Sequence, residues 1–300
     1  MAVYNFKKEL KLYIVYGSTK YKLDIYPDVN FSQTFNESSV PVKTLHTQTN
    51  MFEKAVIIKA NPANFNFTTA ITATSDFDLI LDLLLNYDPT STDATLKTAD
   101  YYVEMNSEVF KLEKGVIEST IFRFSRDEII TITCSGTASK LSKFVGTIPN
   151  SLTTITGKTY TSPNAFELTL GGVVKTNIQS VSVELKSNVE WVENDTLHNS
   201  LTVSGASDSI YPGAFVVSGR TLSGNIQQYI TDETNTTPNT WKNGDSLLIK
   251  LGKTNTPWLF NVAIPAAVYT NRSELQDLLM QSYDYRMISS PTNMSTVIYR

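Results

Sequence analysis

The chain has few of the residues on which disulfide frameworks and metal sites depend. Its 300 residues include one cysteine, Cys134, and two histidines, His46 and His198. A single cysteine excludes an internal disulfide framework, and neither histidine lies near a cysteine or a paired carboxylate at the spacing of zinc ligands. We therefore expect no metal and no other cofactor. Cys134 ends the alternating segment 129–134, which favours a small buried strand residue over a reactive thiol.

An excess of positive charge is also missing. The chain has 25 Lys and Arg residues against 29 Asp and Glu residues, a formal net charge of −4 at pH 7. Proteins that hold DNA or RNA tightly neutralise phosphates with clustered basic residues, so tight nucleic-acid binding is not expected. A surface without that excess is nevertheless suited to a passage through which a polyanion moves without adhering.

Long apolar runs are absent from the sequence. The most apolar segment, 258–269, has twelve residues and contains Asn261 and Pro265, whereas a membrane-spanning helix needs about 20 mainly apolar residues. The first eight residues end in a basic pair, and the apolar residues after it alternate with polar ones. A signal peptide would have a continuous apolar run at this place. We expect no membrane span and no signal peptide.

The motifs that would indicate catalysis are incomplete. The triplets 157–159 and 252–254, both Gly-Lys-Thr, resemble the end of a phosphate-binding loop, but Leu152 and Leu247 occupy the place of its first glycine. A Gly-x-Ser-x-Gly nucleophile motif does not occur in the sequence. We therefore predict that the protein is not an enzyme and name no catalytic residue.

Alternation of apolar and polar residues is the dominant pattern. Such alternation places successive side chains on opposite faces of a strand. Thr, Val, Ile, Tyr and Phe, in which the chain is rich, fit a pleated, half-buried surface better than a helix. We predict a mainly β fold. The clearest alternating segments are 11–16, 55–60, 65–68, 129–134 and 180–185.

One segment, 75–87, has helical periodicity instead. Phe77, Ile80, Leu81 and Leu84 share one helical face, and further leucines make the other sides apolar as well. A serine at its start and an Asp-Pro pair after it delimit the helix. A helix that is apolar on nearly all sides is either buried or lies between subunits. We predict that these four residues contribute to a subunit interface.

The middle of the chain has the composition of a domain junction. Segment 145–164 loses most of its charge and gathers Gly, Pro, Ser and Thr. We predict two tandem domains, 1–150 and 151–300, related by duplication. The alignment predicts a turn and a strand within 273–287. The aligned segments are 29–33 with 189–193, 55–58 with 214–217, 65–68 with 223–226, 116–119 with 268–271, and 128–134 with 278–285.

This duplicated pattern resembles the tail tube protein of long-tailed bacteriophages, of the two-domain kind. The residues that carry the resemblance in the first copy are 29–33, 55–58, 65–71, the helix from Ser75, 101–119 and 128–141, and in the second copy 180–193, 213–231 and 247–288. The resemblance implies two β-sandwich or barrel domains, each flanked by a helix or helical turn, and we place the helical counterpart of the second domain at 226–231. It also implies trimeric rings of pseudo-six-fold symmetry that stack into a tube.

The resemblance further implies a set of partners. Rings would contact each other through long polar loops, 36–54 and 194–212, in which we single out His46, Phe52, His198 and Tyr211. The protein would be made in the host cytoplasm and be part of the virion tail. It would contact other copies of itself and the tape-measure, terminator and baseplate proteins, and a contractile sheath is left open. Viral DNA would pass through the lumen during ejection without specific binding.

Two alternatives are kept. A tail terminator, or a baseplate ring that initiates the tube, would have the same domains and differ mainly in its loops. A two-domain carbohydrate-binding module would also be rich in Thr and Asn, but it should present aromatic platforms. The chain has only three tryptophans, Trp191, Trp241 and Trp258, and they are scattered.

Overall fold

The computed structural model describes residues 10–40, 55–71, 80–81, 83–86, 96–105, 108–125, 128–154, 166–192, 210–230, 244–252, 258–275, 279–288 and 298–299. Most of these residues form strands, which confirms the mainly β fold class. The earlier strands are β1 (Leu10–Tyr16), β2 (Thr19–Leu23), β3 (Asn30–Ser32), β4 (Phe35–Val40), β5 (Ala55–Ala60), β6 (Ala63–Ala70), β7 (Thr98–Met105), β8 (Glu108–Ser125), β9 (Thr131–Ala138), β10 (Lys140–Phe144) and β11 (Ser151–Thr154). The later strands are β12 (Phe166–Leu170), β13 (Val173–Val174), β14 (Ile178–Val192), β15 (Ala214–Tyr229), β16 (Leu247–Gly252), β17 (Trp258–Ile264), β18 (Ala267–Leu275), β19 (Leu279–Met287) and β20 (Ile298–Tyr299).

The strand order in the main sheet is the same in the two halves of the chain. The first half contributes the order β3-β6-β9-β8 and the second half the order β14-β15-β19-β18. A second layer also repeats, with β2-β1-β7-β8 in the first half and β13-β12-β16-β17 in the second. All of these neighbours are antiparallel. Each half therefore consists of a four-stranded unit of the main sheet and a second layer.

Strand β8 belongs to both layers of the first half. Its first part pairs with β7 and its last part with β9, and the register shifts between Ile117 and Ser119. In the second half the corresponding path is divided into β17 and β18, with Pro265 and Ala266 between them. Proline lacks the amide hydrogen that a central strand needs, so the chain is interrupted at this point.

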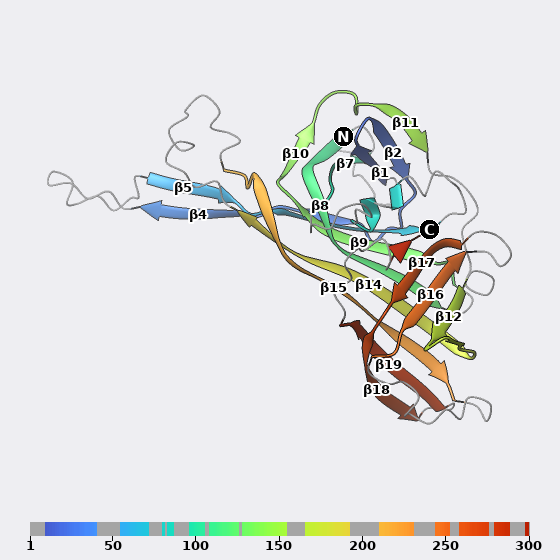
Figure 1. Cartoon of the computed structure of the whole chain (residues 1–300). Coiled ribbons are helices and arrows are strands. Elements are labelled where there is room, and N and C mark those ends of the chain that lie inside the picture. The colour runs from blue at the N-terminus through green and yellow to red at the C-terminus, as the bar shows by residue number, and fades with distance from the viewer. Residues whose placement is uncertain are drawn as a thin grey trace.

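The two four-stranded units join within the chain. Strand β8 of the first unit pairs antiparallel with β14 of the second, so both units form one continuous sheet. Figure 1 shows β8, β14 and β15 side by side through the centre of the molecule. A single buried cluster extends over both halves, from Ile14 and Phe67 to Ile249 and Tyr283.

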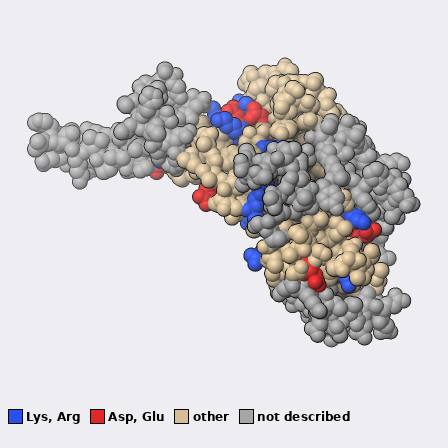
Figure 2. Space-filling model, in the orientation of Figure 1, with Lys and Arg blue, Asp and Glu red and all other residues tan. Residues whose placement is uncertain are grey.

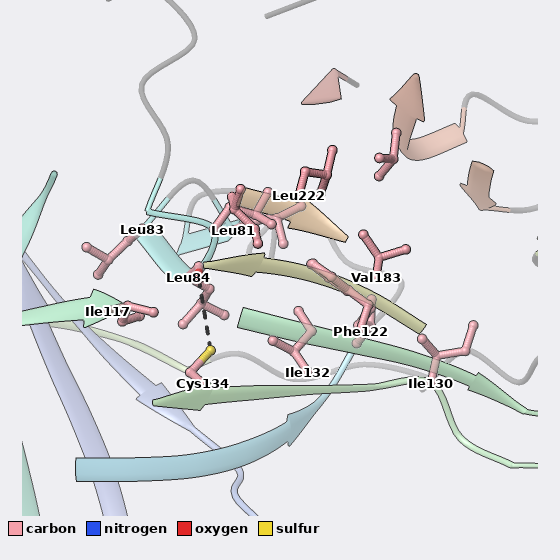
Figure 3. Packing of buried hydrophobic residues seen from close by; sticks show 14 of the residues in the cluster. Leu81, Leu83, Leu84, Ile117, Phe122, Ile130, Ile132, Cys134, Val183 and Leu222 are labelled. Carbon is pink, nitrogen blue, oxygen red and sulfur yellow. Dashed lines mark hydrogen bonds between the residues drawn. The ribbon is translucent and has the colours of Figure 1, made fainter. Parts of the chain in front are cut away.

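A short helical segment lies against the apolar face of this sheet. Its residues Ile80, Leu81 and Leu84 have no exposed surface, and Figure 3 shows Leu81 and Leu84 beside side chains of β8, β9 and β15. The segment ends at Asn86, whose φ of 44° lies in the left-handed region that commonly terminates helices. It is the helical turn expected beside the first unit.

The register corrects two details of the sequence alignment. Phe65 is buried, whereas Ser223 lies on the opposite face of its strand from the buried residues Leu222 and Ile226. Aligning 65–68 with 223–226 therefore exchanges the two faces of the strand. Residues 189–192 pair with 214–217 as 35–40 pair with 55–60, so 189–193 corresponds to β4 and not to 29–33. Polar residues on both sides of these segments left the register undetermined in the sequence.

The predicted helical counterpart at 226–231 is wrong. Its residues up to Tyr229 belong to β15, where they pair with β14 and β19. Two partner strands satisfy the backbone groups of this segment, so pairing overrides its local helix propensity. The strand predicted within 273–287 is confirmed as β19, which forms a hairpin with β18.

A two-stranded arm extends from the body. Strands β4 and β5 pair over Phe35–Val40 and Ala55–Ala60, and Figure 1 shows them projecting away from the main sheet. The predicted polar loop from Asn36 therefore begins as a strand. Residues 189–192 and 214–217 of β14 and β15 form the equivalent pair in the second unit.

Candidate assembly surfaces

The joint between β8 and β14 is the best-defined contact between the two units. Residues 119–125 of β8 pair with 186–180 of β14 without a shift in register. On one face Phe122 lies opposite Val183, and both are buried. On the other face the Ser119 hydroxyl donates a hydrogen bond to Glu184 Oε1 at 3.1 Å. The joint thus combines an apolar contact, a polar contact and a complete ladder of strand pairing.

One face of the continuous sheet is polar across both units. A single row of directly paired residues crosses it in the order Thr68, Thr133, Ile121, Glu184, Ser223 and Arg286. A neighbouring row consists of Thr131, Arg123, Ser182, Asn225 and Asp284. Side chains of one row point to the same face because the period of a strand is two. Thr, Ser and Asn therefore dominate this surface, which we call the polar face.

Hydrogen bonds hold the side chains of the polar face to one another. Asn225 Nδ2 donates to Ser282 Oγ at 2.8 Å and to Asp284 Oδ1 at 2.7 Å. Between β6 and β9, the hydroxyls of Thr68 and Thr133 lie 3.0 Å apart.

Charge on the polar face is mixed in sign. A third row on this face consists of Ser119, Lys186 and Thr221. The three rows contain the charged residues Arg123, Glu184, Lys186, Asp284 and Arg286, so none of these strands carries a run of one charge. The face of the molecule in Figure 2 has blue and red groups near one another, and uncharged residues cover most of its described surface. This arrangement provides no concentrated positive potential.

The opposite face of the sheet is apolar and is covered by the chain itself. Its rows include Ile132, Phe122, Val183 and Tyr285, all buried. Phe65 of this face packs on Tyr101 of β7, with ring centroids 4.7 Å apart. The second layer therefore covers the apolar side, and none of the described strands forms a layer over the polar face.

The eight-strand path β3-β6-β9-β8-β14-β15-β19-β18 of the main sheet ends in two strands that have one strand partner each in the described part of the chain. Strand β3 pairs with β6, and β18 pairs with β19, while β10 and β11 are further strands of this sheet with one partner each, β8 and β2 respectively. Strands β3 and β18 are the first strand of the first unit and the last strand of the second. They are the equivalents of β14 and β8, the two strands that form the joint inside the chain.

Segment 210–213 attaches the second unit to the base of the β4–β5 arm. The amide of Ala60 donates to the carbonyl of Ile210 at 2.9 Å, and Ser139 Oγ donates to the carbonyl of Pro212 at 2.6 Å. The Tyr211 ring lies edge-on to Phe35, with centroids 6.4 Å apart, and Lys140 Nζ lies 4.9 Å from its centroid. Tyr211, one of the predicted stacking residues, is thus half-buried against its own chain.

The other predicted site residues divide into two groups. Phe77, His46, Phe52 and His198 lie outside the described residues. Ile80, Leu81 and Leu84 are fully buried in the core of one chain. These three side chains pack within the chain, and the predicted role of these residues and Phe77 in a subunit interface stays a prediction.

Two further sequence expectations can be compared with the structure. Trp191 Nε1 donates to Thr137 Oγ1 at 2.7 Å, and its ring centroid lies 5.2 Å from that of Phe215. This half-buried tryptophan connects β14 to β9 and does not form an exposed platform. Cys134 is buried, as expected, and its Sγ contacts the Leu84 carbonyl oxygen at 4.0 Å (Figure 3).

Sequence reasoning did not find β3, β18 or the β8–β14 joint as assembly elements. The alternation in 180–185 marked a strand but carried no information on its partner. The one available signal was the repeat itself, because equivalent strands at the ends of repeated units are candidates for equivalent contacts.

The chain is a mainly β protein in which the same strand order occurs in both halves and one face of the main sheet is largely polar. Over residues 2–300 the chain matches the family model described as the Bacteriophage Baseplate Tube Protein Family, and it belongs to that family. It is therefore a structural phage protein of the tail and baseplate, which assembles with other tail components in the virion. No curated protein matches the chain. Within the described residues, none of the helical segments is long and apolar enough to cross a membrane.

Proposed function

We propose that three copies of this protein form a closed ring, and that such rings build the part of the tube that lies in the phage baseplate. The observation that carries the proposal is the β8–β14 joint, because it already links two equivalent four-stranded units edge to edge. Repeating the same contact between chains turns an open sheet into a barrel, and closure removes the exposed edges that promote aggregation.

The copy number of three follows from the resemblance to duplicated tail tube proteins. Two units per chain and three chains give the pseudo-six-fold ring that the resemblance implies. Each chain contributes the eight strands of the path β3-β6-β9-β8-β14-β15-β19-β18. A closed barrel of three times eight strands exceeds the 16–18 strands with which porins already enclose an aqueous channel.

The polar face is the proposed wall of the lumen. The second layer covers the apolar face from the other side, so it would lie on the outside of the barrel. A wall of Thr, Ser and Asn with charges of mixed sign binds DNA weakly, because binding to phosphates depends on the release of counterions by clustered cations. DNA would therefore slide through the ring during ejection.

Stacking of rings is assigned to the two arms. Strands β4 and β5, and the ends of β14 and β15, extend beyond the strands that form the joint. Residues 41–54 and 193–213 lie between the strands of these arms in the sequence. Contacts between unlike surfaces of successive rings generate an open-ended stack.

The family description favours a baseplate segment of the tube over the main tail tube, which is the second candidate.

Electron microscopy of the purified protein, together with its mass in solution over a range of concentrations, tests the proposal. Rings with a central channel and the mass of three chains are the expected result. Short stacks or single rings would support the baseplate segment, and long regular tubes would support the tail tube. A monomer that persists at high protein concentration would contradict ring formation.

A further inference from the structure

We propose that segment 210–213 is a strap that fixes the two arms of one chain to each other, so that the arms move as a single body. The first arm is the β4–β5 pair, and the second arm consists of residues 189–192 of β14 and 214–217 of β15. This inference goes beyond the proposed function, because it concerns contacts within one chain and does not depend on ring formation. In the proposed stack, both arms of a chain would engage a neighbouring ring together.

The strap contacts both strands of the first arm at the base of that arm. Phe35 of β4 is paired with Ala60 of β5. The amide of Ala60 donates to the carbonyl of Ile210 at 2.9 Å, and the Phe35 ring lies edge-on to the Tyr211 ring, with centroids 6.4 Å apart. A displacement of the first arm relative to the strap would therefore break a hydrogen bond and an aromatic contact at the same place.

Two further carbonyl groups of the strap accept hydrogen bonds from the body of the first unit. Ser139 Oγ donates to the carbonyl of Pro212 at 2.6 Å, and Lys114 Nζ donates to that of Gly213 at 3.5 Å. Ser139 and Pro212 are buried, so loss of the bond between them is costly. Proline fixes its own φ and restricts the residue before it, which limits the conformations of Tyr211. The strap is thus stiff and is anchored along its length.

Both strands of the second arm are held to the first unit. The strap leads directly into Ala214, the first residue of β15. On β14, Trp191 Nε1 donates to Thr137 Oγ1 of β9 at 2.7 Å, and Thr137 Oγ1 in turn donates to Glu118 Oε1 of β8. The hydroxyl proton of Thr137 goes to the carboxylate, so the hydroxyl oxygen accepts from the indole. Trp191 also packs on Phe215 of the same arm, with centroids 5.2 Å apart.

Direct contacts therefore lead from β4 and β5 through the strap to β15 and across the second arm to Trp191. Spatial continuity alone does not establish coupling between two sites. Coupling requires that a perturbation of one arm changes the other arm, and that this effect disappears when the strap is weakened.

Hydrogen–deuterium exchange of the backbone amides tests the coupling. Trp191→Phe keeps an aromatic ring but removes the indole donor, so it loosens the second arm at its own contact. Exchange should become faster in 214–217 and also in 55–60, by roughly fivefold for one hydrogen bond of typical strength. The strap variant, Ser139→Ala with Tyr211→Ala, should confine the effect of Trp191→Phe to the second arm.

Ser180→Ala with Tyr26→Ala is the matched control for the strap variant. It removes another serine hydrogen bond, from Ser180 Oγ to Gln227 Oε1 at 2.9 Å, and a partly exposed tyrosine outside the strap. In this background Trp191→Phe should still accelerate exchange in both arms.

Three outcomes would overturn the inference. Exchange in 55–60 could remain unchanged on Trp191→Phe, or its acceleration could persist in the strap variant. Acceleration that extends to 119–125 would show that the substitution destabilises the whole sheet and not the arms. Absence of rings would contradict the proposed function without affecting this result, because exchange is measured on the full chain in the assembly state that the unaltered protein adopts.

Discussion

Gly224 and Tyr285 face each other across β15 and β19, and a Cβ atom added to Gly224 would lie 2.5 Å from Tyr285 Oη. The tyrosine hydroxyl crosses the glycine and donates to the carbonyl oxygen of Ser182 on β14 at 2.9 Å. In the first unit the sizes are exchanged, because Phe65 on β6 faces Gly136 on β9, where an added Cβ would lie 2.8 Å from Phe65 Cζ. In both units, therefore, an aromatic ring of one strand lies over a glycine of the strand paired with it.

This packing predicts that Gly224→Ala destabilises the protein. The new methyl group would clash with the tyrosine and with the Ser182 backbone, and overpacking of this kind costs about 1–3 kcal/mol. The measurement is the free energy of unfolding from urea titration. Gly219→Ala in the same strand is the matched control, because an added Cβ there meets no atom within 4 Å. Equal stability of the two variants would contradict the packing described.

The end of the helical segment gives a second prediction. Asn86 Nδ2 donates to the carbonyl oxygen of Ile117 at 2.6 Å, and its Oδ1 accepts from the amide of Lys97 at 2.7 Å. Asn86→Ala leaves both backbone groups without these partners, and we expect a loss of about 1–3 kcal/mol of unfolding free energy. Asn66→Ala, at an exposed position of β6, should change stability by less than about 0.5 kcal/mol. If Asn86→Ala lowered the unfolding free energy no more than Asn66→Ala does, the stabilising role of the Asn86 hydrogen bonds would be contradicted.

The buried thiol predicts a dependence of stability on alkaline pH. Burial raises the pKa of Cys134 to about 12, and a hydrogen bond with Thr120 opposes this in part. An acid whose pKa is raised on folding binds its proton more tightly in the folded state. Its stabilising contribution is therefore full below the unfolded pKa of about 8.5 and is lost as the pH rises toward 12.

Cys134→Ala should accordingly reduce the slope of unfolding free energy against pH between pH 8.5 and 10. The slope is the informative quantity, since the cavity left by the sulfur lowers stability at every pH. In the unaltered protein a thiol reagent should react with Cys134 only after unfolding. Rapid reaction in the folded protein at pH 8 would show that the thiol is accessible.

The proposed lumen predicts how added charge affects DNA binding. Rings of the unaltered chain should not retain DNA at physiological salt. Ser135→Lys adds a cation on the polar face in every chain, and we expect DNA binding that weakens steeply with salt, as counterion release requires. Val173→Lys is the control, because it adds the same charge on β13 of the second layer, where the valine is 59% exposed. Fluorescence anisotropy with labelled duplex measures both, and stronger binding by the Val173 variant would place the lumen elsewhere.

Local pattern determined much of this protein. Alternation at 11–16, 55–60 and 180–185 was enough to predict β1, β5 and part of β14, because the two faces of a strand impose a period of two. The helical period of the leucines predicted the turn that contains Leu81 and Leu84. The order of elements also pointed to a phage tube protein, and the family match supports this.

Tertiary structure decided which strand pairs with which, and in what register. The alternating pattern of a strand such as 180–185 lies in its own side chains. Its strand partners do not follow from that pattern: Val183 pairs with Phe122 on one side and Gly224 on the other, both distant in sequence, and these residues come together only when the core forms. A shift of one residue exchanges the two faces of a strand. Segments rich in Ser and Asn have little contrast between their faces, so their sequence specifies the register only weakly. The joint between the two units, and the two sheet ends that match it, therefore emerged only from the folded chain.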